Sequence, residues 1–351
     1  MPAFAPIVPE MAVSIHTGPR GVQLYQFPPG KDLSLRWTRT LRDTSTCDIQ
    51  VPSLIVENRL PDIQHWLHWM SVWAPDDPNP LWTGPIRTIG PMNDKTMNIG
   101  ARDPSAFYER TRTPMTKRWE ATDVAYIAEE FWQRMIEHHG LRGRPIVRAD
   151  PNGKPFDYQA TADAGMVGAN IEELVQLGLR WCVVRGVAIL GPAPLKPVAA
   201  LGREHFTDPG PSITRDGSQM FNDVLVRAPE NVARAVADMG GLNLQTIVNR
   251  DNMFGQINVN KAALELARYS AAPRDVLTLP GGAALAPGAP VTLDMLIPST
   301  RVTIEAYGLQ TLQELTGLEV TAAPGAAEAK VTMASVNDNP PELLDSTAVT
   351  S

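Results

Sequence analysis

The side chains that most often carry out chemistry are few in this chain and stand in no familiar catalytic spacing. Among six histidines, His65 and His68 are three residues apart and His138 and His139 are adjacent. None belongs to a His-Glu-x-x-His helix or to a Cys-His set with zinc spacing. Adjacent histidines at the end of a helix are explained more simply by their attraction to its negative pole. We therefore expect no metal site and no cofactor.

The nucleophiles of hydrolases are equally hard to find. The elbow Gly-x-Ser-x-Gly is absent, and Cys47 and Cys182 carry no recognisable nucleophile signature. Two lone cysteines in apolar runs are typical of small core residues, and they exclude a disulfide framework. A glycosidase carboxylate pair is brought together by folding, so spacing does not decide it. We expect a protein that is not an enzyme, and a cell-wall glycan or peptidoglycan hydrolase is the alternative.

Two further segments could bind ions or phosphate but lack the required pattern. Asp76, Asp77 and Asn79 place several oxygens close together, without the alternating ligands, central glycine and terminal glutamate of an EF-hand loop. Gly281 and Gly282 are far from any Gly-Lys-Ser/Thr sequence, so they mark a bend rather than a phosphate cradle. We expect the acidic segment to be a solvated turn.

Tryptophans are the most distinctive side chains of the first third of the chain. Four of the eight lie between residues 63 and 89. Large aromatic rings can pack in a core, anchor a subunit interface or stack on sugar rings, and these three interpretations stay open. The structural or interface candidates are Trp37, Trp66, Trp69, Trp73 and Trp82.

The tryptophan segment has the pattern of a β-hairpin. From His68 to Trp73 the side chains alternate between two faces with the period of a strand. Pro75, Pro78 and Pro80 then interrupt the backbone hydrogen bonding, and a second strand begins near Trp82. This pattern predicts a hairpin with a long, acidic, solvent-facing tip, whose aromatic arms form the wall of a small β-barrel.

The rest of the chain alternates between strand-rich segments and a segment that contains both helices and strands. About seven strands are expected by Arg112, and Asp123 caps a helix whose apolar residues recur from Val124 to Ile136. A shorter helix over 170–179 and a hairpin over 179–190 complete a mixed segment. Strands return from 217 and include 276–279, 291–296, 301–307 and a last hairpin over 315–335, with a helix over 260–270. The segment 230–239 fits a strand or a helix.

The predicted fold is therefore mainly β with an α+β insert, in which two small β-barrel domains flank a mixed middle domain. The expected domains are an N-terminal barrel (1–112), an α+β domain (113–205), a second barrel with a helix near 260–270 (206–335) and a flexible tail (336–351).

Composition excludes two classes of function. The net charge of −7 and the absence of a basic run argue against direct reading of nucleic acid. No segment reaches the roughly 18 uninterrupted apolar residues of a membrane span. The N-terminus lacks the basic region and apolar stretch of a signal peptide, so we expect synthesis in the cytoplasm.

Several strings, in this order, resemble minor tail proteins of long-tailed phages that infect actinobacteria, which are similar to the baseplate hub family of tailed phages. The matching stretches are Leu33 to Arg39, Asp43 to Pro52, Trp69 to Trp73 with Leu81 to Ile86, Asn170 to Leu190, Asp216 to Val226, and Leu285 to Pro290 continuing into Leu296 to Ile304. The resemblance covers about residues 10 to 335.

The resemblance implies a structural role in the virion. The expected protein is a homotrimeric hub at the tail tip of a siphovirus, made in the host cytoplasm. Two barrels per subunit would form a pseudo-sixfold ring that adapts sixfold tail rings to threefold tip components. Its partners would be a distal tail ring, the tape measure and tip or fibre proteins. A carbohydrate-binding tail module is the further alternative.

Overall fold

The computed structural model describes residues 7–336, apart from 20, 31, 58, 76, 142, 151–154, 193–195, 208, 216, 218–219, 251–254 and 272–274. The chain divides into two compact units. The first comprises Met1–Gly210, Leu279–Glu305 and Gln310–Ala334, and the second comprises Pro211–Thr278, Ala306–Leu309 and Ser335–Ser351. The segment 337–351, for which we expected a flexible tail, lies outside the described residues. The three-domain division stays a prediction.

The first seven strands precede Arg112, as the alternating patterns predict. They are β1 (Ala12–Thr17), β2 (Gln23–Phe27), β3 (Ser34–Thr40), β4 (Thr46–Pro52), β5 (His68–Trp73), β6 (Trp82–Met92) and β7 (Thr96–Arg102), followed by the 3-10 helix η1 (Pro104–Arg110). The predicted tryptophan hairpin is confirmed, because β5 and β6 pair antiparallel with Val72 opposite Trp82 and Trp69 opposite Pro85.

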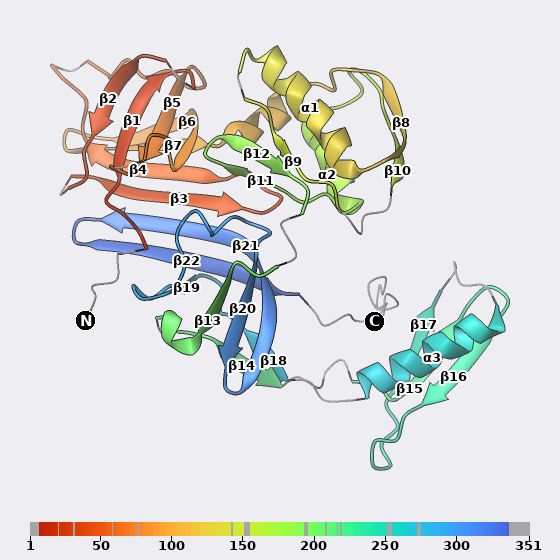
Figure 1. Ribbon diagram of the computed structural model, residues 1–351. Coiled ribbons are helices and arrows are strands. Elements are labelled where there is room, and N and C mark those ends of the chain that lie inside the picture. The colour runs from red at the N-terminus through yellow and green to blue at the C-terminus, as the bar shows by residue number, and fades with distance from the viewer. Residues whose placement is uncertain are drawn as a thin grey trace. The chain divides into compact units, whose positions relative to one another are not determined.

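The last strands of the chain belong to the same sheet as the first ones. They are β19 (Ala283–Ala284), β20 (Arg301–Ala306), β21 (Leu309–Ala323) and β22 (Ala326–Ser335). In Figure 1 the C-terminal blue strands lie beside β3, and the pairing places Gly317 opposite Thr40 and Ala322 opposite Leu35. Together with β13 (Ala199–Gly202), they make one 12-stranded sheet.

This sheet corrects the expectation of two barrels. Its strands follow the open order β13-β20-β21-β3-β4-β7-β6-β5-β1-β2, with β22 beside β21 and β19 beside β22. Among the described residues no sheet closes on itself. The structure is mainly β, with 44% of residues in strands and 16% in helices, so the predicted fold class is confirmed at that level.

The predicted mixed segment contains two helices and two small sheets, β10-β8 and β11-β12-β9. Its elements are β8 (Lys117–Thr122), α1 (Val124–His138), β9 (Ile146–Val147), β10 (Phe156–Ala160), α2 (Val167–Gln176), β11 (Trp181–Val184) and β12 (Val187–Leu190). The expected cap is confirmed, since the Asp123 carboxylate accepts a hydrogen bond from the Ala125 amide at 2.8 Å. The short 3-10 helix η2 (Arg203–His205) follows β13.

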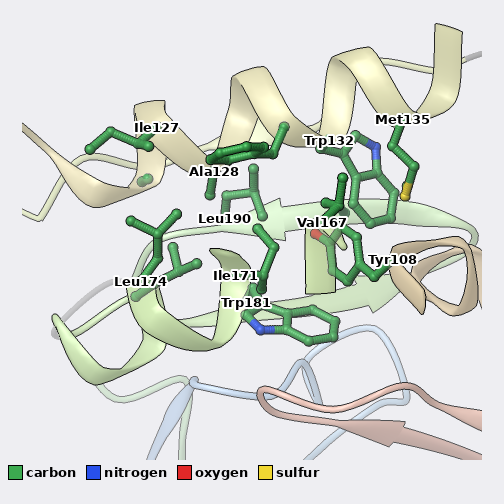
Figure 2. Packing of buried hydrophobic residues seen from close by; sticks show 14 of the residues in the cluster. Tyr108, Ile127, Ala128, Trp132, Met135, Val167, Ile171, Leu174, Trp181 and Leu190 are labelled. Atoms are coloured by element: carbon green, nitrogen blue, oxygen red, sulfur yellow. The ribbon is translucent and has the colours of Figure 1, made fainter. Parts of the chain in front are cut away.

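Aromatic contacts hold this mixed segment together. Figure 2 shows Tyr108 of η1 between Trp132 of α1 and Trp181 of β11. The ring centroids lie 5.4 Å and 5.5 Å apart, both edge to face, an arrangement that aromatic pairs favour. The helix α2 begins three residues earlier than predicted, and the amide of its first residue, Val167, donates to the Thr111 carbonyl at 2.8 Å.

The second unit is a small layer of sheet and helix. Its strands are β14 (Ser212–Arg215), β15 (Asp223–Arg227), β16 (Val232–Val236), β17 (Gln245–Asn249) and β18 (Asp275–Thr278). The helix α3 (Gln256–Ser270) covers one face of the sheet β16-β15-β17, where Val224, Val226, Val248 and Leu266 form the core. The segment 230–239, which the pattern left open, contains the strand β16.

One predicted strand is wrong. Residues 291–296 form turns rather than a strand. Pro290 and Pro298 flank the segment, and the carbonyls of Leu293 and Leu296 accept hydrogen bonds from the Arg39 guanidinium. These carbonyls are therefore satisfied by a side chain instead of a neighbouring strand.

Candidate functional site

The five candidate tryptophans occupy two kinds of environment. Trp37, Trp69 and Trp82 are at most 3% exposed, so the chain itself buries them. Trp66 and Trp73 are half-buried. An open sugar platform requires exposed rings, so only the two half-buried tryptophans could contribute to one. Whether any of the five contacts another subunit stays a prediction.

Trp73 lines a cleft of about 620 Å³ in the first unit. Its lining includes residues of β1, β5 and β6, Trp132 of α1 and the turn between β11 and β12. The indole N–H of Trp73 donates to the Ser14 hydroxyl at 2.8 Å, which fixes the ring at the edge of the cleft. The cleft combines aromatic and proline side chains with hydroxyl groups, a lining that suits a small ligand or a peptide segment.

A chain of polar side chains runs along the floor of this cleft. His16 Nδ1 donates to the Gly18 carbonyl, and its Nε2 lies 2.8 Å from Ser71 Oγ. Ser71 Oγ is 2.7 Å from the Thr83 hydroxyl. Because a carbonyl oxygen only accepts, Nδ1 carries the ring proton and Nε2 accepts from Ser71. Burial lowers the pKa of His16, which favours this neutral form.

The His16–Ser71 contact has the geometry of a base beside a nucleophile, but its surroundings favour a structural role. Ser71 lies in the middle of β5, which pairs with β1 on one side and β6 on the other. The backbone amides around Ser71 are therefore used in the sheet and cannot stabilise an oxyanion. The polar chain satisfies buried groups between three strands.

At the tip of the tryptophan hairpin Asp77 forms an ion pair, which corrects the expectation of a solvated side chain at this position. The Asp77 carboxylate lies 2.7 Å from the Arg185 guanidinium, and both side chains are 23% exposed. Arg185 also contacts Asp294 at 2.7 Å. The pKa of Asp77 is lowered by its hydrogen bond to Arg185. Asp76 lies outside the described residues, and Asn79 donates its amide to Asp77.

A buried arginine, Arg39 of β3, connects the large sheet to the segment 291–297 through hydrogen bonds. Arg39 is 1% exposed and donates to the carbonyls of Leu293 at 2.7 Å and Leu81 at 3.3 Å. Its guanidinium lies 5.0 Å from the centroid of the Trp37 ring. Burial lowers the pKa of Arg39 to about 10, so the side chain keeps its charge at neutral pH. No sequence motif indicated this residue, since one arginine among alternating strand residues is expected to face solvent.

Trp66 stands apart from the other tryptophans. Its backbone φ of 69° is in the left-handed region, which bulky residues rarely adopt. Its ring packs 5.1 Å from Phe107, and the guanidinium groups of Arg87 and Arg110 lie 4.5 Å and 5.8 Å from the ring centroid. Trp66 was a candidate from the sequence, whereas no pattern in the sequence indicated a role for Arg87 or Arg110.

The described part of the chain shows no group of three or more His, Cys, Asp or Glu side chains that could hold a metal ion. Burial raises the pKa of Cys182 to about 12 and that of Cys47 as well, so both thiols stay protonated at neutral pH. Among the described helices, none is long and apolar enough to cross a membrane.

No family model and no curated protein sequence matches the chain. Several solved structures match the chain in fold. The 43 kDa tail protein of prophage MuSo2 from Shewanella oneidensis aligns over 92% of this chain and 97% of its own length, with 14% identity and a TM-score of 0.58. A tail protein from Neisseria meningitidis aligns over 93% and 97%, with 14% identity and a TM-score of 0.56. The prophage tail protein gp18 from Listeria monocytogenes has 10% identity and a TM-score of 0.50 over 93% of this chain. Across nearly their whole lengths, these three proteins and the present chain share one fold.

Proposed function

We propose that this chain is a structural component of a phage tail. The observation that carries the proposal is the similarity in fold to two tail proteins over at least 92% of this chain and 97% of theirs. A match of this extent includes the mixed segment and both β-rich regions, rather than one common domain. The chain would therefore be found in the virion, and it would act by geometry rather than by catalysis.

The finer proposal is a baseplate hub or minor tail protein that forms a homotrimer at the tail tip of a siphovirus. In this proposal the trimer would connect a sixfold tail ring to a threefold tip. The partners would be the distal tail ring, the tape measure and tip or fibre proteins. The host group suggested by the sequence resemblance, actinobacteria, belongs to the same proposal.

The ends of the large sheet support such an assembly. Among the described strands β2 pairs only with β1 and stands at one end of the strand order. Val22, just before β2, and Leu24, within it, are 72% and 39% exposed. An unpaired edge strand is a template for pairing with another chain. In the proposed ring, a neighbouring tail protein or subunit would cover this edge.

Particle imaging of assembled virions tests the proposal. Three copies around the tail axis would support the hub, and six equivalent copies would assign the chain to a tail ring. Copies attached only at the periphery would favour receptor binding. An isolated chain can be monomeric without contradicting the hub, because a tail partner raises the effective concentration of neighbouring subunits.

A carbohydrate-binding module is the second candidate, and the half-buried Trp73 at the edge of the 620 Å³ cleft is the observation that favours it. If this cleft binds sugars, Trp73→Ala should abolish the retention of the protein on host cell-wall preparations, whereas Trp66→Ala should not. Equal retention of the parent protein and both variants would remove the cleft from consideration.

A further inference from the structure

Two arginines from different elements converge on one half-buried indole in the first unit. Arg87 comes from β6 and Arg110 from the end of η1, and their guanidinium groups lie 4.5 Å and 5.8 Å from the centroid of the Trp66 ring. The Trp66 amide donates to the Ile86 carbonyl at 2.9 Å, which holds the indole next to Arg87. The arrangement therefore depends on the fold, not on a chance contact of two flexible side chains.

The positive charge of this cluster is not balanced within the described residues. Neither Arg87 nor Arg110 has a carboxylate within ion-pair distance there, although the chain as a whole carries a net charge of −7. By contrast, Arg36, Arg180 and Arg185 each pair with an acidic side chain. Two guanidinium groups that contact the same indole and form no ion pair with any described residue give this surface a positive charge that is complementary to carboxylates.

An exposed apolar residue next to Trp66 in the sequence indicates what kind of partner the site could bind. Leu67 follows Trp66 and is 63% exposed, and the Leu67 carbonyl is bonded to the Gly18 amide at 2.9 Å. A free phosphate ion would use the arginines but not this apolar surface. A peptide segment that carries both acidic and apolar side chains would use both. Tryptophan and arginine are also the side chains that dominate binding energy at protein interfaces.

We propose that Trp66, Arg87, Arg110 and Leu67 form a docking site for an acidic segment of a partner protein. Carboxylates of the partner bind the two guanidinium groups, and an apolar side chain of the partner packs against the indole and Leu67. The left-handed backbone at Trp66, with φ of 69°, turns the ring towards Phe107, which supports it at 5.1 Å. This site does not depend on the proposed tail role, because any partner with this chemistry would bind.

The test uses the full chain labelled with 5-fluorotryptophan, and the Trp66 signal is assigned by its loss in Trp66→Phe. The probe is the peptide Glu-Leu-Glu-Glu-Leu-Glu, compared with Gln-Leu-Gln-Gln-Leu-Gln and with inorganic phosphate. We expect the acidic peptide alone to shift the Trp66 fluorine signal, with an affinity that falls as salt is added. A double variant, Arg87→Gln with Arg110→Gln, should bind about tenfold more weakly or worse.

Two further variants keep the test decisive. Arg110→Glu changes only an exposed side chain at the end of η1, so it should fold and lose binding even if the double variant is unstable. Arg118→Gln, at an exposed position of β8, is the matched control and should bind like the parent. Equal binding of the neutral peptide, full binding by Arg110→Glu, or an equal effect of phosphate would each overturn the proposal.

Discussion

At the residue scale, Trp82 gives the simplest measure of the hairpin's contribution to stability. The side chain is 2% exposed at the start of β6, and Trp82→Ala should lower the free energy of unfolding by about 3 to 5 kcal/mol, the usual range for a large buried aromatic. Denaturant melts measure this loss. The same change at the half-buried Trp73 should cost less. A loss below about 1 kcal/mol for Trp82→Ala would show that the ring is not in the core.

Asp103 should make stability depend on pH in an unusual direction. Burial raises the pKa of this carboxyl from 3.8 to about 6, against hydrogen bonds from Ser45 and Ser105. At a pH between the unfolded-state pKa of 3.8 and the folded-state pKa of about 6, the Asp103 carboxyl is protonated in the folded state and ionised in the unfolded state. The free energy of unfolding therefore decreases as the pH rises from about 4 to about 6. The shift corresponds to roughly 3 kcal/mol at most.

The comparison of the parent with Asp103→Asn isolates this effect. Asp77 and Asp223 have lowered pKa values and give stability that increases with pH, but they do so equally in both proteins. Melts between pH 4 and pH 7 should therefore show a difference between the two proteins that changes with pH. Parallel curves would contradict the assignment to Asp103.

Residue types alone did not reveal which polar side chains the fold would bury. His139 illustrates the limit, because its Nε2 lies 2.8 Å from the Thr111 hydroxyl and its ring centroid 4.5 Å from that of Phe107. Burial, with a smaller effect of the neighbouring His138, lowers the pKa of His139. The residue does lie at the C-terminal end of α1, and its attraction to the helix pole stays a prediction. Its environment therefore depends on Thr111, which is 28 residues away in sequence.

At the scale of elements, Arg39 connects β3 to a segment without regular structure. Arg39→Met should remove charge-assisted hydrogen bonds from the carbonyls of Leu293 and Leu81 and lower stability by about 2 to 5 kcal/mol. Hydrogen exchange should also accelerate in residues 291–297. The control is Arg36→Met on the same strand, whose exposed ion pair with Glu319 contributes less than about 1 kcal/mol. Equal losses for the two variants would show that burial of Arg39 has no special role.

Elements with a strong local pattern were predictable, and elements that depend on distant contacts were not. The β5–β6 hairpin, the Asp123 cap of α1 and the turn at Arg185-Gly186 follow from alternation, capping and turn chemistry, and the structure confirms them. The turn has φ values of 55° and 78°, which suit the tight reversal. Residues 291–296 have the composition of a strand, but the carbonyls of Leu293 and Leu296 accept hydrogen bonds from the Arg39 side chain of β3.

At the scale of the whole molecule, the sheet of the second unit has one uncovered face. Side chains alternate along β16 and β17, so Val232, Val236 and Ile247 lie opposite α3, and each is at least 54% exposed. Val232→Lys with Ile247→Lys should leave the stability of the isolated chain within about 0.5 kcal/mol and, under the proposed tail role, reduce incorporation into assembled tails. Ile257→Lys, 83% exposed on α3, is the control and should assemble normally. Normal assembly of the double variant would show that this face contacts no partner.

The global arrangement was the least predictable level. Strand-like residue patterns in the first and last parts of the sequence suggested two separate barrels, but such patterns carry no information on which distant strands pair. The pairing of β21 with β3 joins the two β-rich regions into one sheet, and that pairing depends on register along the whole of both strands. The resemblance of ordered strings did point to a tail-protein fold, because it used element order instead of local pattern.

The joining of β3 to β21 also has a consequence for biosynthesis. Arg36 and Glu319, which pair across these two strands, are 283 residues apart. At about 5 to 20 residues per second, the ribosome needs roughly 15 to 60 s to make that interval. During this time one edge of β3 has no partner strand, and nascent chains emerging close together on one messenger RNA can pair through it. The sheet is completed only after β21 has been synthesised, so slower elongation between β3 and β21 should increase aggregation of the nascent chain.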